Sequence, residues 1–122
     1  MKRAKILIID DDPVFTGLLL AVLGDDHQVF TANSGDGGID IIDTQTPDLI
    51  LLDISMPHVN GYEVLKHLKA DPSKADIAVI VISSLVGTPD KDFALKLGAD
   101  DYMTKPVLPA VLQNKVEMFL QR

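Results

Sequence analysis

Aspartate follows a short apolar run at two places in this chain. Residues 6–9 lead into Asp10 and Asp11, and residues 49–52 lead into Asp53. An unpaired buried carboxylate is costly, so acids placed directly beside buried strands indicate a site. If the fold brings the two segments together, their mutual repulsion favours a cation between them. Carboxylate oxygens are ligands that Mg²⁺ prefers, and the sequence therefore predicts a magnesium site.

A hydroxyl and a lysine end two further segments. Ser83 follows the apolar run 77–82, and Lys105 follows residues 100–104, with Pro106 after it. A carboxylate is a competent nucleophile toward phosphorus, and the charged oxygens of a transferred phosphoryl group need a cation and donors around them. Acids, a hydroxyl and an ammonium group at successive strand ends therefore predict a magnesium-dependent site that handles phosphoryl groups.

The ligands of the ion can be assigned from its chemistry. Mg²⁺ keeps several waters, so we expect Asp11 and Asp53 to bind it directly, Asp10 to bind it through water, and the Ser55 backbone carbonyl to complete the protein's share. Each segment alone could have a purely structural role. Acidic side chains stabilise a helix N-terminus, and an aspartate after a strand is common in turns. Their coincidence at one end of a sheet favours the site.

Composition restricts the class of protein without deciding its function. The 122 residues fit one domain, residues 1–122, and the absence of cysteine excludes disulfides and thiolate metal sites. The net charge of −7 argues against direct binding of nucleic acid. No apolar run approaches the roughly 20 residues that span a bilayer, and the first residues lack the apolar part of a signal peptide, so we expect a cytoplasmic protein without membrane contact.

Apolar runs and helix signals alternate five times along the chain. The expected strands are residues 5–10, 29–31, 48–53, 77–82 and 100–104. The five expected helices run from Pro13 to Gly24, from residue 36 to 45, from Asn60-Gly61 to Asp71-Pro72, from residue 89 to 97, and from Leu108 to near Phe119. Asp12 and Ser34 are expected N-caps, because their short side chains accept hydrogen bonds from the first helical turn.

This alternation predicts an α/β fold of the flavodoxin-like, doubly wound (βα)5 type. We expect a five-stranded parallel sheet in the order 2-1-3-4-5, with helices on both faces. The continuous apolar runs 48–53 and 77–82 are typical of central strands covered on both sides. Functional groups of such sheets gather beyond the carboxyl ends of the strands, where the winding reverses. Asp10, Asp11 and Asp53 end the first and third strands and should meet there.

The helical period also predicts which side chains are buried. The first helix is expected to bury Val14, Leu18, Leu19, Val22 and Leu23. The last helix is expected to bury Leu108, Val111, Leu112, Val116 and Phe119. The histidines have no metal-ligand spacing and are expected at the surface; they are His27, His58 and His67.

Taken together, these motifs resemble the receiver domains of response regulators in two-component signalling. The resemblance extends from Lys5 to the end of the last helix. It rests on residues 6–13 (ILIIDDDP), 47–57 (PDLILLDISMP), 60–61 (NG), 83–84 (SS), 98–102 (GADDY) and 105–106 (KP).

The resemblance implies a phosphorylation-dependent signalling switch. Asp53 would be the phosphoacceptor, with Asp10 and Asp11 as the acidic pair that holds Mg²⁺. The phosphoryl donor would be a histidine kinase or a histidine phosphotransfer domain. Such a protein is not an enzyme acting on other molecules, since it catalyses only its own phosphorylation and dephosphorylation.

The resemblance also implies how the switch works. Lys105 would contact the phosphoryl group, its bond to Pro106 would be cis, Ser83 would turn toward the group, and Tyr102 would move inward behind Ser83. The fourth helix, fifth strand and fifth helix would then present a changed surface to an effector protein or domain. The protein would be a monomer or a homodimer that forms on phosphorylation.

Several positions depart from the family's common pattern. Ser83 stands where threonine is frequent, so its coupling to Tyr102 is expected to be looser. Residues 98–102 resemble receivers that dimerise through their fourth and fifth helices, and Asp101 and Lys115 are candidates for an ion pair across that interface. Val111 stands where such receivers carry an acid.

Two alternatives remain open at this point. A phosphatase of the haloacid dehalogenase type would use Asp10 as its nucleophile, with Ser83 and Lys105 in supporting roles. Its second acidic motif is missing, however, and Asp53 would have no function in it. A receiver that acts only as a scaffold is the other alternative, and the complete set of acids, hydroxyl and lysine disfavours it.

Overall fold

The computed structural model describes residues 3–54, 61–84 and 88–121. Three residues with predicted positions or roles lie outside this part of the chain: Ser55, His58 and Asn60. The strands are β1 (Lys5–Ile9), β2 (Gln28–Ala32), β3 (Leu49–Leu52), β4 (Ala78–Ser83) and β5 (Asp101–Thr104). The helices are α1 (Pro13–Leu23), α2 (Gly35–Gln45), α3 (Gly61–Ala70), α4 (Thr88–Lys96) and α5 (Pro109–Leu120).

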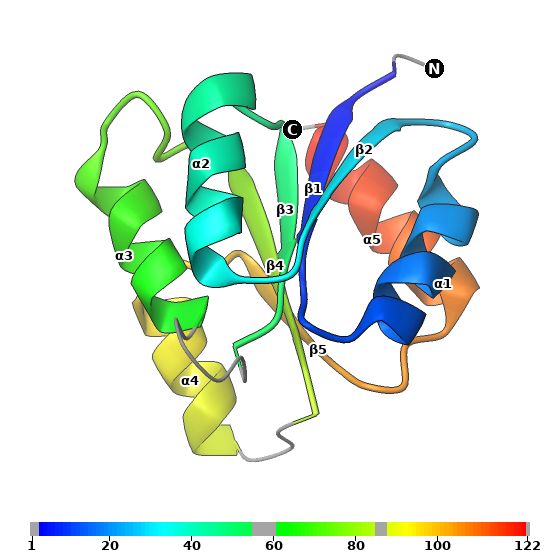
Figure 1. The fold of residues 1–122 in the computed structure, drawn as a ribbon. Helices are drawn as coiled ribbons and strands as arrows, with labels where there is room; N and C mark the ends of the chain where they lie inside the picture. Colours follow the sequence, from blue (N-terminus) through cyan, green and yellow to red (C-terminus); the bar gives the residue numbers. More distant parts are fainter. Residues whose placement is uncertain (1–2, 55–60, 85–87, 122) are drawn as a thin grey trace.

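The strands form one parallel sheet in the order β2-β1-β3-β4-β5, as predicted. Helices cover both faces: α2, α3 and α4 lie on one side and α1 and α5 on the other (Figure 1). The observed element bounds differ from the predicted ones by one or two residues. Among the described residues, no helix has the length and apolar character needed to cross a membrane.

Two apolar layers hold the sheet between the helices. Residues of β1, β3 and β4 alternate between them, so that Leu7, Ile50 and Val79 face α2–α4 while Ile8 and Leu51 face α1 and α5. All of these side chains are buried. Burial on both faces explains why these strands read as continuous apolar runs.

The ends of two helices are capped as predicted. Asp12 accepts a hydrogen bond from the N–H of Val14 at the start of α1, and Ser34 accepts one from the N–H of Gly37 at the start of α2. The Lys105–Pro106 peptide bond is cis, which is also as predicted.

The predicted buried face of α1 was partly wrong. Val14 is 80 % exposed and Leu18 is 46 % exposed, whereas Leu19 and Leu23 are buried. The helix is rotated so that Phe15, four residues before Leu19, packs on the core in place of Val14. Phe15, Leu19 and Leu23 are four residues apart and therefore lie on one face.

In α5 the prediction failed at two positions. Leu108 precedes the first helical residue and is 67 % exposed, and Val111 is exposed as well. The helix packs on the sheet through Leu112 and Val116.

His27 was predicted at the surface and is buried instead, with 2 % of its side chain exposed. Its Nδ1 accepts a hydrogen bond from the N–H of Ala4 at 3.3 Å, and its Nε2 lies 3.4 Å from Oε1 of Glu117. The ring thus joins the start of β1 to α5, and these polar partners make its burial tolerable. His67 is partly exposed, as expected.

The predicted role of Asp101 and Lys115 also needs correction. These residues form an ion pair with each other inside one chain, from β5 to α5. Each charge is therefore already matched within the chain, and the pair is no argument for a contact between two copies.

Candidate functional site

The ends of β1 and β3 place the acidic residues next to one another. The N–H of Asp53 donates to the carbonyl of Ile9 at 2.9 Å, and the N–H of Asp10 donates to the carbonyl of Ala32 at 3.0 Å. These bonds continue the parallel ladder one residue beyond each strand. One carboxylate oxygen each from Asp10, Asp11 and Asp53 lies within 4.8 Å of the others. The predicted acidic cluster therefore forms.

Gly61 lets α3 begin directly behind Asp53. A Cβ at this position would lie 2.6 Å from the backbone oxygen of Asp53 and 2.8 Å from Cα of Ile54. Any larger residue would push the helix away from the segment that carries the carboxylate. The glycine at the start of the predicted third helix is thus required by close packing.

Lys105 reaches the acids from the end of β5. Its N–H donates to the carbonyl of Ser83 at 2.8 Å, which sets the residue beside the end of β4. Its ammonium group donates to Oδ2 of Asp10 at 2.9 Å and lies 3.9 Å from Oδ2 of Asp53. The lysine therefore partly neutralises two of the three carboxylates.

Asp10 is the most constrained acid of the cluster. Its side chain is 3 % exposed, and its two oxygens accept from the N–H of Asp12 and from Lys105. Burial raises the pKa of its carboxyl, and the charge of Asp53 adds to this effect, while the hydrogen bonds from Lys105 and Asp12 oppose it. Excess negative charge remains, which a divalent cation would relieve.

The donor set fits a magnesium ion. Asp11 is exposed and turned toward water, whereas Asp10 and Asp53 are buried. Two buried carboxylates beside one exposed carboxylate suit an ion that binds protein oxygens on one side and keeps waters on the other. The predicted carbonyl ligand from Ser55 lies outside the described residues.

Ser83 and Tyr102 occupy neighbouring strands beside the cluster. Ser83 is fully buried at the end of β4, and Tyr102 is half-buried in β5, where its register partner is Val81. Tyr102 packs against the core layer under α2–α4. The roles of Ser83 as the switch hydroxyl and of Tyr102 as the aromatic residue behind it, and the movement of both, stay predictions.

Two contacts of the site were not predicted. The ammonium group of Lys105 lies over the ring of Phe15, 4.4 Å from its centroid. Gly38 of α2 packs against Ile9, the residue before Asp10; a Cβ there would lie 2.4 Å from Cδ1 of Ile9. The adjacent pair Gly37-Gly38 was the visible signal for the second contact, whereas nothing in the sequence linked residue 15 to residue 105.

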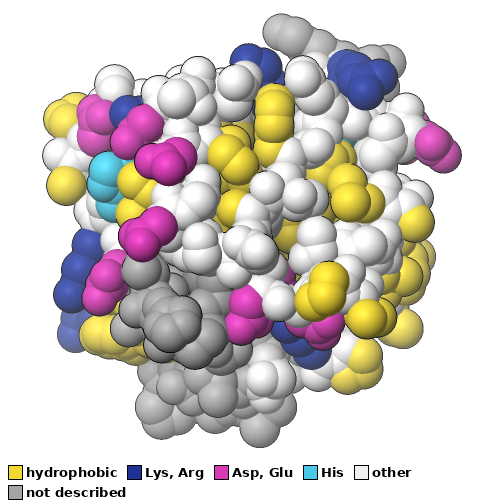
Figure 2. All heavy atoms as spheres, viewed as in Figure 1, with side chains coloured by type: hydrophobic (Ala, Val, Ile, Leu, Met, Phe, Trp, Pro, Cys, Tyr) yellow, Lys and Arg dark blue, Asp and Glu magenta, His cyan; other side chains and the backbone are white. Residues whose placement is uncertain are grey.

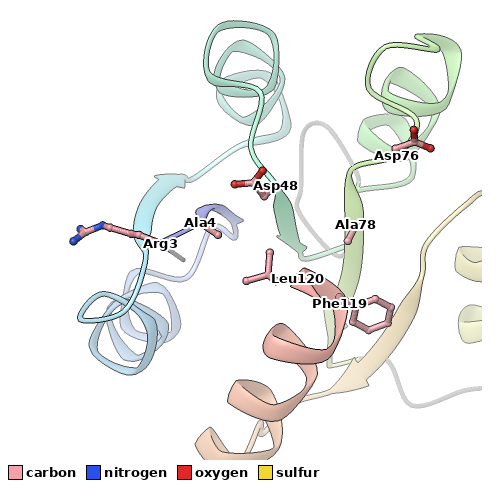
Figure 3. A pocket seen from close by; sticks show the side chains of 7 residues that line it. All are labelled: Arg3, Ala4, Asp48, Asp76, Ala78, Phe119 and Leu120. Atoms are coloured by element: carbon pink, nitrogen blue, oxygen red, sulfur yellow. The ribbon is translucent and has the colours of Figure 1, made fainter. Parts of the chain in front are cut away.

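Two of the cavities found among the described residues lie at opposite ends of the strands. One of about 370 Å³ adjoins the acids and includes Asp10, Asp11 and Gly17 in its lining. The other, of about 450 Å³, lies at the amino ends of the strands, between Asp48, Asp76 and the end of α5 (Figure 3). Figure 3 shows Arg3 at its rim with the guanidinium group turned outward. The larger cavity is thus remote from the acidic cluster.

Comparison with known proteins gives one consistent family. The family model described as "Response regulator receiver domain" matches residues 6–117. The transcriptional regulatory protein AfsQ1 of Streptomyces coelicolor is 35 % identical over 117 residues, which cover 96 % of this chain and 51 % of that protein. The chain spans about half the length of the curated relatives it matches.

Solved structures agree with this result. A CheY-like response regulator receiver domain protein from Methanospirillum hungatei superposes with a TM-score of 0.91 at 27 % identity, covering 98 % of this chain and 95 % of that one. The BeF3-activated receiver domain of Klebsiella pneumoniae RstA gives 0.88 at 31 % identity, with 97 % and 99 % covered. With the strand order and the acidic cluster described above, these matches show that the chain belongs to the response regulator receiver domain family.

Proposed function

We propose that residues 1–122 form one receiver domain in which Asp53 accepts a phosphoryl group from a histidine kinase or a histidine phosphotransfer domain. The observation that carries this proposal is the meeting of Asp10, Asp11 and Asp53 within 4.8 Å, with the Lys105 ammonium group 3.9 Å from Asp53. A nucleophile, a cation site and a positive charge for the phosphoryl oxygens thus lie together.

The chemistry assigns a separate task to each group. An oxygen of Asp53 attacks phosphorus, the bond from phosphorus to the donor's imidazole nitrogen breaks, and the imidazole leaves with the electron pair. Mg²⁺, when bound by Asp10, Asp11 and Asp53, neutralises charge on the phosphoryl oxygens. Lys105 shifts from Asp10 toward one of these oxygens, a movement that the flexible lysine stem allows.

The hydrogen bonds of Asp10 argue against Asp10 as the nucleophile. Both oxygens of Asp10 already accept hydrogen bonds, one from the backbone of Asp12 and one from Lys105. A carboxylate that accepts a donor on each oxygen is a weaker nucleophile, because these hydrogen bonds take up part of its negative charge. The geometry thus argues against the phosphatase reading, in which Asp10 would attack.

The proposed output is a changed protein–protein contact. The dianion on Asp53 recruits Lys105 and the Ser83 hydroxyl, Tyr102 follows, and the surface of α4, β5 and α5 changes for a downstream effector protein or domain. Lys105→Ala should retain Mg²⁺ binding and lose this coupling, because the ammonium group is the direct contact between the phosphoryl group and β5.

Beryllofluoride, a phosphoryl mimic, tests the proposal without a kinase. With Mg²⁺ present, it should shift backbone amide signals around Asp53 and along β4, β5 and α5 in the wild type. Asp53→Asn should abolish these shifts, whereas Asp12→Asn, which changes an exposed acid next to the cluster, should preserve them. Equal shifts in Asp53→Asn and wild type would refute Asp53 as the acceptor.

A further inference from the structure

The ring of Phe15 lies beneath the ammonium group of Lys105. The distance from Nζ to the ring centroid is 4.4 Å. A cation within about 6 Å of an aromatic face is attracted by the ring quadrupole. The same ammonium group is 2.9 Å from Oδ2 of Asp10 and 3.9 Å from Oδ2 of Asp53. Its neighbours thus include two carboxylates and one neutral ring.

The position of the ring is set by the packing of α1. Phe15 is the third residue of the helix that begins after the acids, and its half-buried side chain packs on the core layer formed with α5. The rotation of α1 that exposes Val14 brings Phe15 inward. The core therefore holds the ring under Lys105, whichever ions the acids bind.

A bound Mg²⁺ would change the balance around Lys105. The ion would take up the charge of Asp10 and Asp53 and would repel the ammonium group. The lysine stem is flexible and the side chain is 21 % exposed, so the ammonium group could leave for water. The ring is neutral, and its attraction for a cation persists when the carboxylates are neutralised.

We infer that Phe15 is a positioning residue that keeps the Lys105 ammonium group beside Asp53 while the acids hold Mg²⁺. The lysine is then already in place for the oxygens of the incoming phosphoryl group. This inference rests on the proposed function, which supplies the phosphoryl group and the ion, and it adds a residue to which no role has been assigned.

The inference predicts two effects of opposite sign. Without the ring, Lys105 leaves more readily, so Mg²⁺ meets less positive charge and should bind about two- to threefold more tightly. Phosphoryl transfer should slow by about two- to thirtyfold, the range that a cation–π contact of this kind spans. General damage to the site would instead lower both the Mg²⁺ affinity and the rate of phosphoryl transfer.

The test uses Phe15→Leu, which keeps an apolar side chain, and Phe15→Tyr, which keeps a ring. Phe119→Leu is the matched control, since Phe119 is a half-buried phenylalanine of the same core layer at the far end of α5. A trifluorinated phenylalanine at position 15 gives a fourth variant, because fluorine weakens the quadrupole with little change of shape. All variants are made in the full chain.

Three readouts are compared: Mg²⁺ affinity from backbone amide shifts, the rate of phosphorylation by acetyl phosphate, and the ring-current shift of the Lys105 Cε protons with Mg²⁺ bound. Phe15→Leu and the fluorinated variant should bind Mg²⁺ more tightly and react more slowly. In Phe15→Tyr and Phe119→Leu both quantities should stay near wild type. The ring-current shift should be present in wild type and lost in Phe15→Leu.

Two results would overturn the inference: an absent ring-current shift in the Mg²⁺-bound wild type, or equal losses of Mg²⁺ affinity and rate in Phe15→Leu. Failure of the proposed function is distinguishable from both. If the wild type accepts no phosphoryl group, the ring-current shift and the Mg²⁺ affinities still decide whether Phe15 holds Lys105 beside the ion.

Discussion

The ammonium group of Lys105 lies 2.9 Å from Oδ2 of Asp10, although 95 positions separate the two residues in sequence. The pair joins the end of β5 to the end of β1 and uses an oxygen that a cation would also seek. A magnesium ion bound at Asp10 would therefore share this carboxylate with the lysine. It would displace or weaken the ion pair, and this would link the metal to Lys105, the residue proposed to contact the phosphoryl group.

The first prediction concerns the cost of the buried charge on Asp10. Burial raises the pKa of this carboxyl above its ordinary 3.8, so the folded chain holds the proton more strongly than the unfolded chain. Stability contributed by this group is therefore present below about pH 4 and falls as the pH rises through the raised pKa. Asp10→Asn should stabilise the fold at pH 7 without Mg²⁺, on the order of 1 kcal/mol.

Urea unfolding at pH 4 and pH 7 measures this effect. Asp12→Asn is the control, since it removes an exposed acid next to the cluster and asparagine is as good an N-cap as aspartate. Mg²⁺ at a hundredfold excess over its dissociation constant should stabilise the wild type by about 2.7 kcal/mol and Asp10→Asn by much less. An Asp10→Asn protein that is less stable than wild type at pH 7 would contradict this account.

The second prediction contrasts two helical glycines. A Cβ at Gly38 would lie 2.4 Å from Cδ1 and 2.8 Å from Cγ1 of the fully buried Ile9, whereas a Cβ at Gly17 would meet nothing within 4 Å. Gly38→Ala should lose about 1 kcal/mol, because overpacking exceeds the gain in helix propensity. Gly17→Ala should gain about 0.5–1 kcal/mol. Thermal unfolding of the two variants provides the comparison. A Gly38→Ala variant that is more stable than wild type would contradict the prediction, because Ile9 would then move aside for the methyl group at little cost.

The third prediction concerns acid denaturation at the α2–α3 surface. Figure 2 shows acidic side chains gathered around a histidine over these helices. Nearby, Asp71 accepts hydrogen bonds from the hydroxyl and N–H of Ser73 and from Lys74, which lower the pKa of Asp71 to about 2. A lowered pKa means that the stability contributed by Asp71 is present above about pH 4 and is lost as the pH falls through about 2.

Removing one donor at a time tests this assignment. Ser73→Ala removes the hydroxyl donor and retains Lys74, so the pKa of Asp71 should rise part of the way toward its ordinary value. Asp71→Asn should flatten the loss of stability between pH 4 and pH 2. Carbon NMR of the Asp71 carboxyl gives the midpoint directly, and a midpoint near the ordinary value in wild type would show that these hydrogen bonds are not maintained in solution.

Much of the fold and the acidic cluster was predictable from the sequence, for a common reason. In a parallel sheet the carboxyl ends of all strands lie on the same side, so residues that directly follow strands, such as Asp10, Asp53 and Lys105, must approach each other. The strand order and the doubly wound arrangement were confirmed. The carboxylates and the ammonium group at these strand ends then favour a magnesium site that handles phosphoryl groups.

The features that could not be predicted depend on small rotations and single polar partners. Apolar residues occur on more than one face of α1, so the sequence does not decide which face is buried. The packing of the helix on the sheet buries the face with Phe15, Leu19 and Leu23 and leaves Val14 exposed. His27 shares no metal-ligand spacing with the other histidines and was therefore expected at the surface, yet the N–H of Ala4 gives it a buried partner. Gly38 reads as a weak helix start, whereas its contact with Ile9 supplies the physical reason for glycine.

The most direct test of the central claim is labelling with radioactive acetyl phosphate in the presence of Mg²⁺. The account predicts a hydroxylamine-labile label on the wild type, which is lost in Asp53→Asn and when Mg²⁺ is removed. Label that persists at the wild-type level in Asp53→Asn would contradict the account and make Asp10 the leading candidate for the nucleophile.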